Sequence, residues 1–186
     1  MDTTPTEFER LVAEGLAASH ADQREAALQL FARASEVEPG SGVPHFLIGS
    51  EHASAGDFEA AELAFACAVL LAPGFTIARY QLGLLQFSTR RAPLALLTWQ
   101  PLLALPDHDA LPHLVRGFRA LAEDAFEESL AHFRRGLGCE PANPALCSDV
   151  LQLVDAVEKL QAPRQEERDE PVAGHFLLSA YGRGLH

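Results

Sequence analysis

The chain has few of the residues that mark several common classes of protein. Its 186 residues include only three cysteines, at an odd count and without a Cys-x-x-Cys pair. Neither a disulfide framework nor a zinc site is therefore predicted, and we expect reduced, mostly packed thiols. No run of about 18 uncharged apolar residues occurs, and the first residues lack both regions of a signal peptide. We therefore expect a cytoplasmic protein without membrane insertion.

Positive charge is also scarce. Lys and Arg number 14 against 26 Asp and Glu, which gives a formal net charge of −12, and no segment gathers the basic residues. A phosphate backbone requires such a basic cluster, so nucleic acid is not an expected partner. Apolar residues make up 48% of the chain, enough for a packed core.

The sequence does have a period of 34 residues. Glycine recurs at Gly15, Gly49, Gly83 and Gly117, and an aromatic residue follows sixteen positions later at Phe31, Phe65, Trp99 and Phe133. A column of small residues comprises Ala27, Ala61, Ala95 and Ser129, while Pro39, Pro73 and Pro141 mark repeat ends and Asp107 interrupts that series. A shared period in several columns predicts a repeat protein.

The second repeat shows what one unit should be. Pro44 suits the first turn of a helix that runs to about residue 55, and Gly56-Asp57 forms a turn. A second helix follows over 58–71 and ends before Pro73. Small residues at Gly49 and in the second helix let the two helices approach closely, with Phe65 beside the contact. Each repeat is therefore predicted to be an antiparallel helix pair.

These columns resemble the tetratricopeptide repeat (TPR) family. The resemblance implies an all-α solenoid of four helix-turn-helix repeats over about residues 8–143, with a C-terminal capping helix and an extended tail. The third repeat departs most from the family pattern, because Pro101 lies inside its second helix. A proline there removes a backbone hydrogen bond, so we expect that helix to be kinked or short.

The two ends of the chain can also be interpreted. Thr4-Pro5-Thr6-Glu7 predicts an N-cap at Thr4, with the first helix starting there. Asn143-Pro144 opens a helix with one apolar stripe, which comprises Leu146, Val150, Leu153, Val157 and Leu160. We predict a solenoid with its cap over 1–161, a charged linker over 162–171 and an apolar tail over 172–186.

The resemblance further implies a concave groove lined by the first helix of each repeat. The positions that line it are Val12, Leu16, Phe46, Ser50, Tyr80, Leu84, Phe87, Leu114, Phe118 and Leu121. Within the third and fourth repeats they recur at helical spacing, so this apolar stripe does not depend on the resemblance alone. Any of them can instead belong to the helix–helix core. An apolar groove favours an extended hydrophobic segment or an amphipathic helix as partner.

The tail is a separate candidate for binding. Its apolar residues Phe176, Leu177, Leu178 and Tyr181 follow a linker long enough to reach back over the cap. We expect these residues to dock on the protein's own solenoid or on a neighbouring copy. The alternative is a free anchor for a partner.

Neither metal binding nor catalysis is predicted for this chain. Eight histidines are present, but no HxxxH or HExxH spacing occurs, and His45, His52 and His113 should occupy equivalent surfaces rather than converge. No phosphate loop, nucleophile elbow or pair of catalytic carboxylates occurs. We expect no metal, no cofactor, no catalytic residue and no enzymatic activity. The acidic pairs Glu123-Asp124 and Glu127-Glu128 should face solvent.

The leading hypothesis is a protein–protein interaction scaffold or adaptor that binds an apolar segment in its groove. A sharper version is a secretion-system chaperone, because small acidic chaperones of that kind are TPR proteins of similar size, although they typically have three repeats. The alternative is a regulatory or structural subunit that docks through its tail or convex face. Self-association as a homodimer stays open.

Overall fold

The structure is a computed structural model that describes residues 5–139 and 144–161, with side chains over 5–139 and 148–159. All regular secondary structure in these ranges is helical, as the repeat pattern predicts. Contacts divide the chain into two compact units, with the boundary between Leu82 and Gly83. The predicted linker and tail lie outside the described residues.

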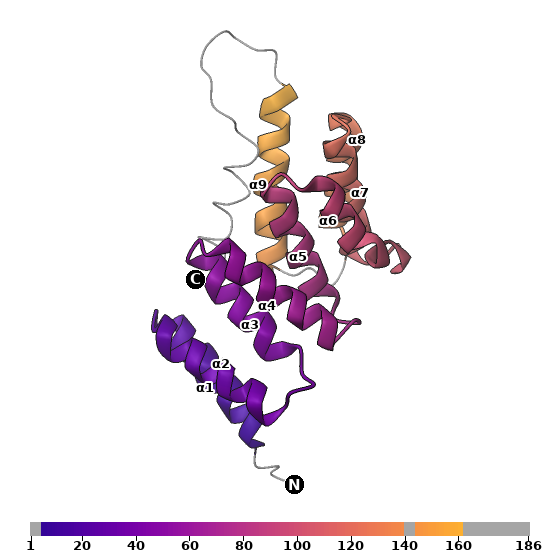
Figure 1. Cartoon of the computed structure of the whole chain (residues 1–186). Coiled ribbons are helices and arrows are strands. Elements are labelled where there is room, and N and C mark those ends of the chain that lie inside the picture. The colour runs from indigo at the N-terminus through magenta and orange to yellow at the C-terminus, as the bar shows by residue number, and fades with distance from the viewer. Residues whose placement is uncertain (1–4, 140–143, 162–186) are drawn as a thin grey trace. The chain divides into compact units, whose positions relative to one another are not determined.

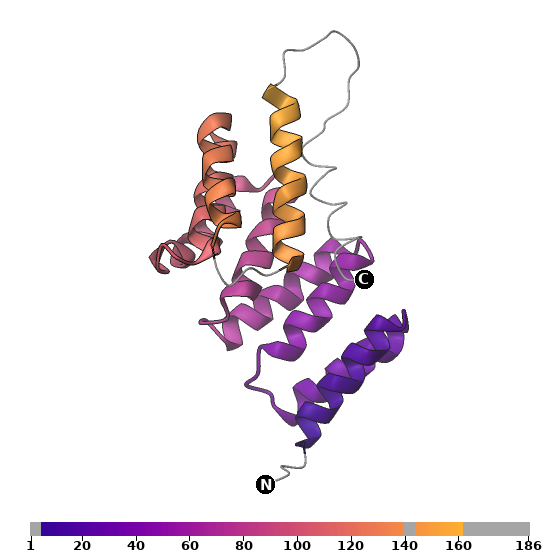
Figure 2. The same cartoon turned by 180° about the vertical axis from the view of Figure 1, so that it is seen from behind.

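Unit 1 contains two antiparallel helix pairs. α1 (Glu7–His20) packs against α2 (Arg24–Val37), and α3 (Val43–Ser54) packs against α4 (Phe58–Leu71), as Figure 1 and Figure 2 show. α2 also packs against α3, so the two pairs form one stack. The bounds of α4 are those that the 34-residue period predicts. Pro44 lies in the first turn of α3, where its missing N–H leaves no hydrogen bond unmade.

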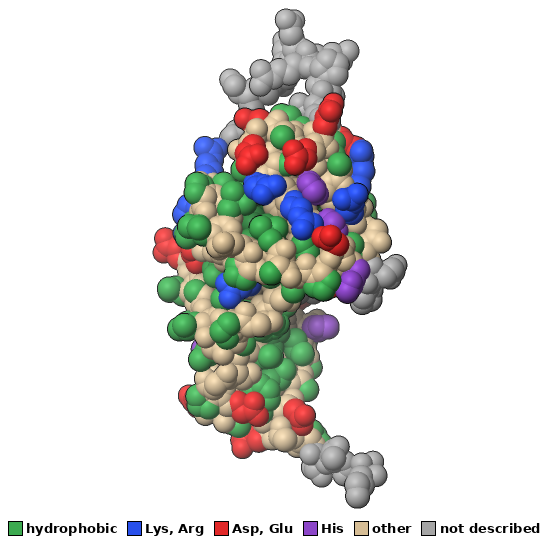
Figure 3. Space-filling view, turned by 90° about the vertical axis from the view of Figure 1, so that its right-hand side faces the viewer, with side chains coloured by type: hydrophobic (Ala, Val, Ile, Leu, Met, Phe, Trp, Pro, Cys, Tyr) green, Lys and Arg blue, Asp and Glu red, His purple; other side chains and the backbone are tan. Residues whose placement is uncertain are grey.

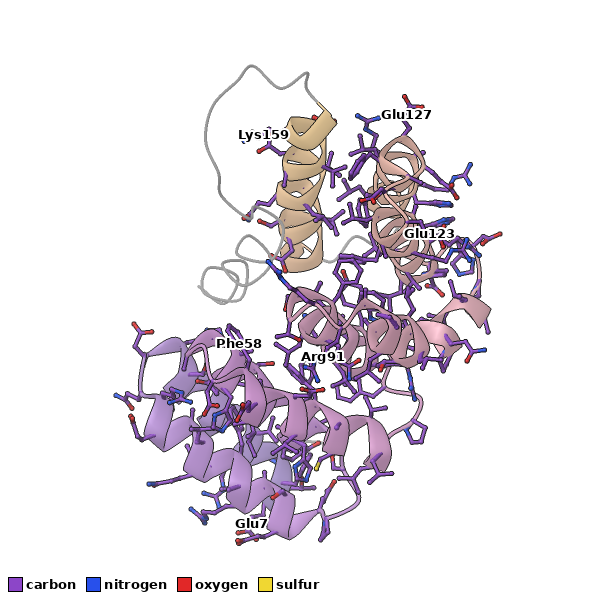
Figure 4. All side chains as sticks on the ribbon, turned by 45° about the horizontal axis from the view of Figure 1, so that its top comes forward. Glu7, Phe58, Arg91, Glu123, Glu127 and Lys159 are labelled. Carbon is purple, nitrogen blue, oxygen red and sulfur yellow. The ribbon has the colours of Figure 1, made fainter. Side chains whose placement is uncertain are left out.

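Unit 2 begins within α5 (Thr76–Ser88) and repeats the same plan with one irregularity. The elements that follow are α6 (Ala92–Trp99), η1 (Gln100–Ala104), α7 (Ala110–Ala122), α8 (Phe126–Leu137) and α9 (Pro144–Gln161). α7 and α8 form an antiparallel pair, and α9 packs against α8. Figure 4 shows side chains of α8 and α9 directed toward each other.

The third repeat is irregular where the sequence predicts it. Its second helix, α6, has only eight residues and ends at Trp99, and the chain continues as a 3-10 helix that contains Pro101. Proline cannot donate the hydrogen bond that the next α-helical turn needs, so the tighter helix replaces it.

Glycine and aromatic residues pack against each other inside every repeat. A Cβ built on Gly49 would lie 2.6 Å from Cδ1 of Phe65, and one built on Gly117 would lie 2.5 Å from Cε1 of Phe133. Gly15 meets Phe31 and Gly83 meets Trp99 in the same way. The predicted close approach of the two helices is confirmed, because only glycine leaves room for the ring.

The start of α1 differs from the prediction. Thr6, not Thr4, is the N-cap: its Oγ1 accepts from the Glu9 N–H at 3.1 Å, and the Glu9 carboxylate accepts from the Thr6 N–H at 2.7 Å. The predicted start at Thr4 is wrong because the same Thr-x-x-Glu spacing occurs twice, two residues apart. Pro5 lies before this cap rather than inside the helix.

The turn inside each repeat uses one left-handed residue. These residues again follow the 34-residue period: Asp22 (φ 57°), Gly56 (φ 78°), Arg90 (φ 64°) and Asp124 (φ 57°). Only the second repeat has glycine there, and it is the residue that the sequence marks as a turn.

Ser129 is the one polar member of the small-residue column, and replacing it should stabilise the protein. Its side chain is 0% exposed, and its hydroxyl has no hydrogen-bond partner among the described residues. Ser129→Ala should therefore raise the free energy of unfolding by about 1 kcal/mol in urea titrations. The control is Ser88→Ala, because the buried Ser88 hydroxyl donates to the Leu85 carbonyl at 2.8 Å and should not give this gain. A loss of stability in Ser129→Ala would contradict the conclusion that the buried Ser129 hydroxyl lacks a hydrogen-bond partner.

α9 contains a half-buried carboxyl group, that of Asp149, and burial disfavours its charged form. Val150, Leu153 and Val157 are buried as the predicted stripe requires, and burial raises the pKa of Asp149 to about 6. A pKa higher in the folded state than in the unfolded state means that folding binds protons. Stability therefore falls as the pH rises from about 4 to about 6, and the Asp149 charge costs stability above that range.

Asp149→Asn should consequently stabilise the protein at neutral pH. We expect a gain of about 1 kcal/mol near pH 7.5, after allowance for solvent screening of a half-buried group, and no gain near pH 4. Urea unfolding at several pH values measures it. Asp155→Asn on the same helix is the control, since Asp155 is exposed and pairs with Lys159 at 2.6 Å. An equal gain at both pH values would overturn the explanation.

Candidate functional site

The ten predicted groove positions fall into two groups by exposure. Leu16 is 38% exposed, and the other partly exposed positions are Val12, Phe46, Ser50, Phe87 and Leu121. Leu114 and Phe118 are 1% exposed, Tyr80 is 2% exposed and Leu84 is 6% exposed. For these four residues the structure favours the alternative interpretation, that of helix–helix core.

The aromatic contacts of unit 2 show the physical reason. Trp99 packs against both Phe87 and Phe118, with ring centroids 6.0 Å and 4.9 Å away. Phe118 also contacts Phe87 at 5.0 Å and Phe133 at 5.2 Å. A residue at the centre of such a cluster stabilises the fold and cannot line an exposed surface. The six partly exposed positions are the remaining candidates for a partner-binding groove, which stays a prediction.

The outer face of α4 carries the most exposed large apolar side chains of unit 1. Leu63 and Leu70 are 71% and 78% exposed, and Cys67 between them is an exposed free thiol. Together with Ala66 these residues follow one face of the helix, at helical spacing, and we call them the α4 stripe. Burying one leucine from water is worth about 1.5–3 kcal/mol, so the stripe is a substantial source of binding energy.

Comparison between repeats shows that the fold does not need this stripe. Leu63 and Leu70 correspond, 34 residues earlier, to Gln29 and Glu36 on α2, and Cys67 corresponds to Arg33. The first repeat therefore forms the same helix with a polar outer face. In unit 2, Leu97 occupies the same repeat position as Leu63 and is 68% exposed.

Polar contacts explain one of the histidines that the sequence singles out. His52 Nδ1 lies 3.2 Å from Arg24 Nη2 and 3.1 Å from Asp57 Oδ2. Arg24 also donates to the Glu51 carbonyl at 3.3 Å, and the Ser19 hydroxyl donates to the Glu51 carboxylate at 2.5 Å. This network joins the first two repeats, so His52 has a structural role.

Other predictions concern metal, membrane and surface charge. Over residues 5–139 and 144–161, no three His, Cys, Asp or Glu side chains are placed to hold a metal ion. None of the helices in these ranges combines the length and apolar character needed to span a bilayer. Glu123, Asp124, Glu127 and Glu128 are exposed, as predicted. The tail candidates Phe176, Leu177, Leu178 and Tyr181 lie outside the described residues.

The helix pairs, the glycine–aromatic contacts and the repeated turn define a TPR-type fold. Solved structures agree. MamA from Desulfovibrio magneticus RS-1 superposes with a TM-score of 0.60 at 16% identity, over 87% of this chain and all of that one. YrrB, described as a TPR protein with an unusual peptide-binding site, superposes with a TM-score of 0.56 at 18% identity, over 82% of this chain and 78% of that one.

These likenesses show that the chain has the all-α TPR fold that its sequence predicts. No sequence profile of a known protein family matches the chain, and no curated protein sequence matches it. At this level of identity the comparison is informative about fold, while function has to be argued from the surfaces.

Proposed function

We propose that the protein is an interaction scaffold that binds an apolar or amphipathic segment of another protein, with the α4 stripe as its main docking surface. The observation that carries this proposal is the exposure of Leu63 and Leu70 at positions where the first repeat has Gln29 and Glu36. Large apolar side chains on an exposed face, at positions where a polar face serves the fold equally well, favour a binding role. YrrB has the same fold and an unusual peptide-binding site, which supports protein or peptide as the ligand class.

The geometry of the stripe favours an amphipathic helix as the partner segment. Leu63 and Leu70 are seven residues apart on one helix, which corresponds to about 10 Å along its axis. A partner helix with apolar residues at spacings of three and four can pack along this length, ridge into groove. Glu59 continues the exposed face at its N-terminal end, so a basic residue at that end of the partner would be favourable.

The predicted groove is the second candidate surface, because Leu16 is 38% exposed on α1. A secretion-system chaperone would hold a hydrophobic stretch of its cargo there. The two surfaces are chemically separable, since Leu16 has a polar counterpart of its own: Ser50 stands at the same position of the second repeat.

The experiment exchanges residues between repeats. The stripe variant Leu63→Gln/Leu70→Glu introduces the residues of the first repeat at these positions, and the groove variant Leu16→Ser introduces the residue of the second. Each change places a side chain where the same fold already has it, so both variants should remain folded by circular dichroism. Wild type and variants are then used to capture partners from lysate of the source cells, followed by mass spectrometry.

We expect a partner that wild type and the groove variant retain and the stripe variant loses. A partner lost only in the groove variant would overturn the role of the stripe and favour the groove, including a chaperone's cargo. Light scattering of the purified protein tests self-association: a dimer that the stripe variant abolishes would make a second copy the occupant.

A further inference from the structure

Unit 2 contains a hollow with an unusual concentration of positive and imidazole side chains. Its volume is about 740 Å³ and it is lined by Asp107, His108, His113, Arg116, His132, Arg135, Gly138 and Cys139. Figure 3 shows Arg and His side chains gathered on one face of the molecule, with acidic groups around them. In a protein with a net charge of −12, two arginines and three histidines around one hollow call for an explanation.

The irregular third repeat builds one wall of this pocket. After η1 the chain turns through Asp107, which stands where the other three repeats have proline. The Asp107 carbonyl accepts a hydrogen bond from His113 Nε2 at 2.8 Å, and its carboxylate pairs with Arg116 Nη1 at 3.1 Å. Because a carbonyl can only accept, the proton of the His113 ring is on Nε2. His113 Nδ1 is then free to accept from Arg116, 3.4 Å away.

α8 builds the opposite wall. The rings of His113 and His132 stack with their centroids 6.4 Å apart, and His132 Nε2 lies 3.7 Å from the Glu128 carboxylate. Arg135 follows His132 at helical spacing, and its side chain makes no ion pair or hydrogen bond within the part of the chain that the structure describes. Its neighbour Arg134 differs, since it pairs with Glu158 on α9 at 2.6 Å.

The repeat pattern shows that neither of the first two repeats has this combination of side chains. At the positions of His113, Arg116, His132 and Arg135 the second repeat has His45, Ile48, Ala64 and Cys67, and the first has Leu11, Glu14, Leu30 and Arg33. On α7, His113 and Arg116 lie about 80–160° round the helix from Leu114, Phe118 and Leu121, and none of the ten groove positions lines the hollow. The pocket is therefore distinct from the predicted groove.

Electrostatics favour a negative ligand. Burial lowers the pKa of His132, and the neighbouring Arg116, His113 and Arg135 lower it further against the opposing effect of Glu128. Burial and Asp109 raise the pKa of the Cys139 thiol, which favours the neutral thiol, while Arg135 lowers it. Arg135 thus brings a positive charge without an ion-pair partner among the described residues to the wall of the pocket, and a bound anion would favour the protonated, donating form of the neighbouring His132 ring.

We propose that this pocket between α7, α8 and the turn at Asp107 binds the phosphate or carboxylate group of an organic ligand. Arg135 supplies the bidentate donor that such groups prefer, and the rings of His132 and His113 line the space beside it. The Asp107 carboxylate, 80% exposed, competes with the ligand for Arg116. This inference is independent of the α4 stripe, which lies in unit 1.

The test is isothermal titration of the full chain with inorganic phosphate, acetate, a phosphoserine peptide and a glutamate peptide. We expect saturable binding that Arg135→Gln weakens by about tenfold or more. Arg33→Gln is the matched control, because Arg33 holds the same position in the first repeat, and it should leave binding unchanged. Asp107→Asn should tighten binding several-fold, a direction that a merely damaged fold would not produce.

The choice of probe identifies the source of the anion. Tighter binding of a peptide than of the free ion would indicate an acidic or phosphorylated side chain of a partner, and equal binding would indicate a small molecule; both support the pocket. The proposal is overturned by absence of saturable binding for every probe up to about 10 mM. Equal weakening in Arg135→Gln and Arg33→Gln would overturn it as well, because general charge attraction would then explain the binding.

A pH series adds an independent readout. Sulfate keeps its charge between about pH 6 and pH 8, so tighter sulfate binding at the lower pH reports protonation in the pocket. The groups around His132 are Glu128 and Arg135 on α8 and His113 and Arg116 on α7, while Asp107, His108, Asp109 and Cys139 complete the pocket and its edge. The variant His132→Thr introduces the residue that the third repeat has at this position, Thr98. It should remove most of the pH dependence of sulfate binding and retain part of the affinity. An unchanged pH dependence would contradict the part assigned to His132.

Discussion

Gly117→Ala is expected to lower the free energy of unfolding by about 3 kcal/mol, at the upper end of what overpacking a core usually costs. The new Cβ would lie 2.5 Å from Cε1 of Phe133, a side chain that is itself 0% exposed. Phe133 cannot withdraw, because its ring packs against Phe118. The two helices of the fourth repeat would therefore have to move apart. Urea unfolding followed by circular dichroism measures the loss.

A second glycine serves as the control for this effect. A Cβ added at Gly74 meets nothing within 4 Å, so Gly74→Ala should be neutral or slightly stabilising. Adding Phe133→Leu to Gly117→Ala should recover part of the lost stability, since a smaller side chain leaves room for the methyl group. A Gly117→Ala variant within about 0.5 kcal/mol of wild type would contradict the close-packing explanation.

Trp99→Ala should be at least as damaging, with an expected loss of about 4 kcal/mol. Trp99 is 0% exposed and lies at the centre of the aromatic cluster of unit 2, in contact with Phe87 and Phe118. Alanine would leave a cavity that the short α6 and the following 3-10 helix cannot fill. Since Trp99 is the only tryptophan, circular dichroism rather than fluorescence must follow unfolding of the variant.

The conservative replacement separates ring packing from indole chemistry. Trp99→Phe introduces the residue that the other three repeats have at this position, and we expect it to cost less than about 1.5 kcal/mol. Equal losses in the two variants would mean that the indole itself, rather than the filled volume, stabilises unit 2.

The period of 34 residues was sufficient to predict the helix pairs because glycine, aromatic and small residues serve the same contact in every repeat. It also predicted where the pattern fails, since Pro101 cannot occupy the interior of an α-helix. The start of α1 was not predictable from local sequence. Two equivalent caps overlap there, and Thr6, the cap in use, leaves Pro5 outside the helix.

Burial was harder to predict than helical structure. An apolar stripe such as Leu114, Phe118 and Leu121 has the same spacing whether it lines a groove or fills a core. Leu114 and Phe118 are 1% exposed, which favours the core for these two residues, while Leu121 is partly exposed. The α4 stripe gave a signal that comparison between repeats could have found. Leu63 replaces Gln29, and Leu70 replaces Glu36, at positions that should face outward.

The pocket of unit 2 was not predictable for a related reason. Along the first helices of the repeats, His45 and His113 are equivalent and do not converge. The convergence is instead between the two helices of one repeat, where His113 meets His132. The pocket is completed by the turn at Asp107, which follows the irregular end of the third repeat and which no spacing rule predicts.

The most direct test of the proposed docking surface uses Cys67 as a built-in reporter. Its thiol is exposed at the centre of the α4 stripe, so a bound partner should shield it from alkylation, as followed by mass spectrometry. Cys139, which lines the pocket of unit 2, is the internal control. We predict that the partner captured by the wild-type protein slows alkylation of Cys67 by about tenfold or more and leaves Cys139 unchanged. Alkylation of Cys67 at the same rate with and without saturating partner would contradict the account.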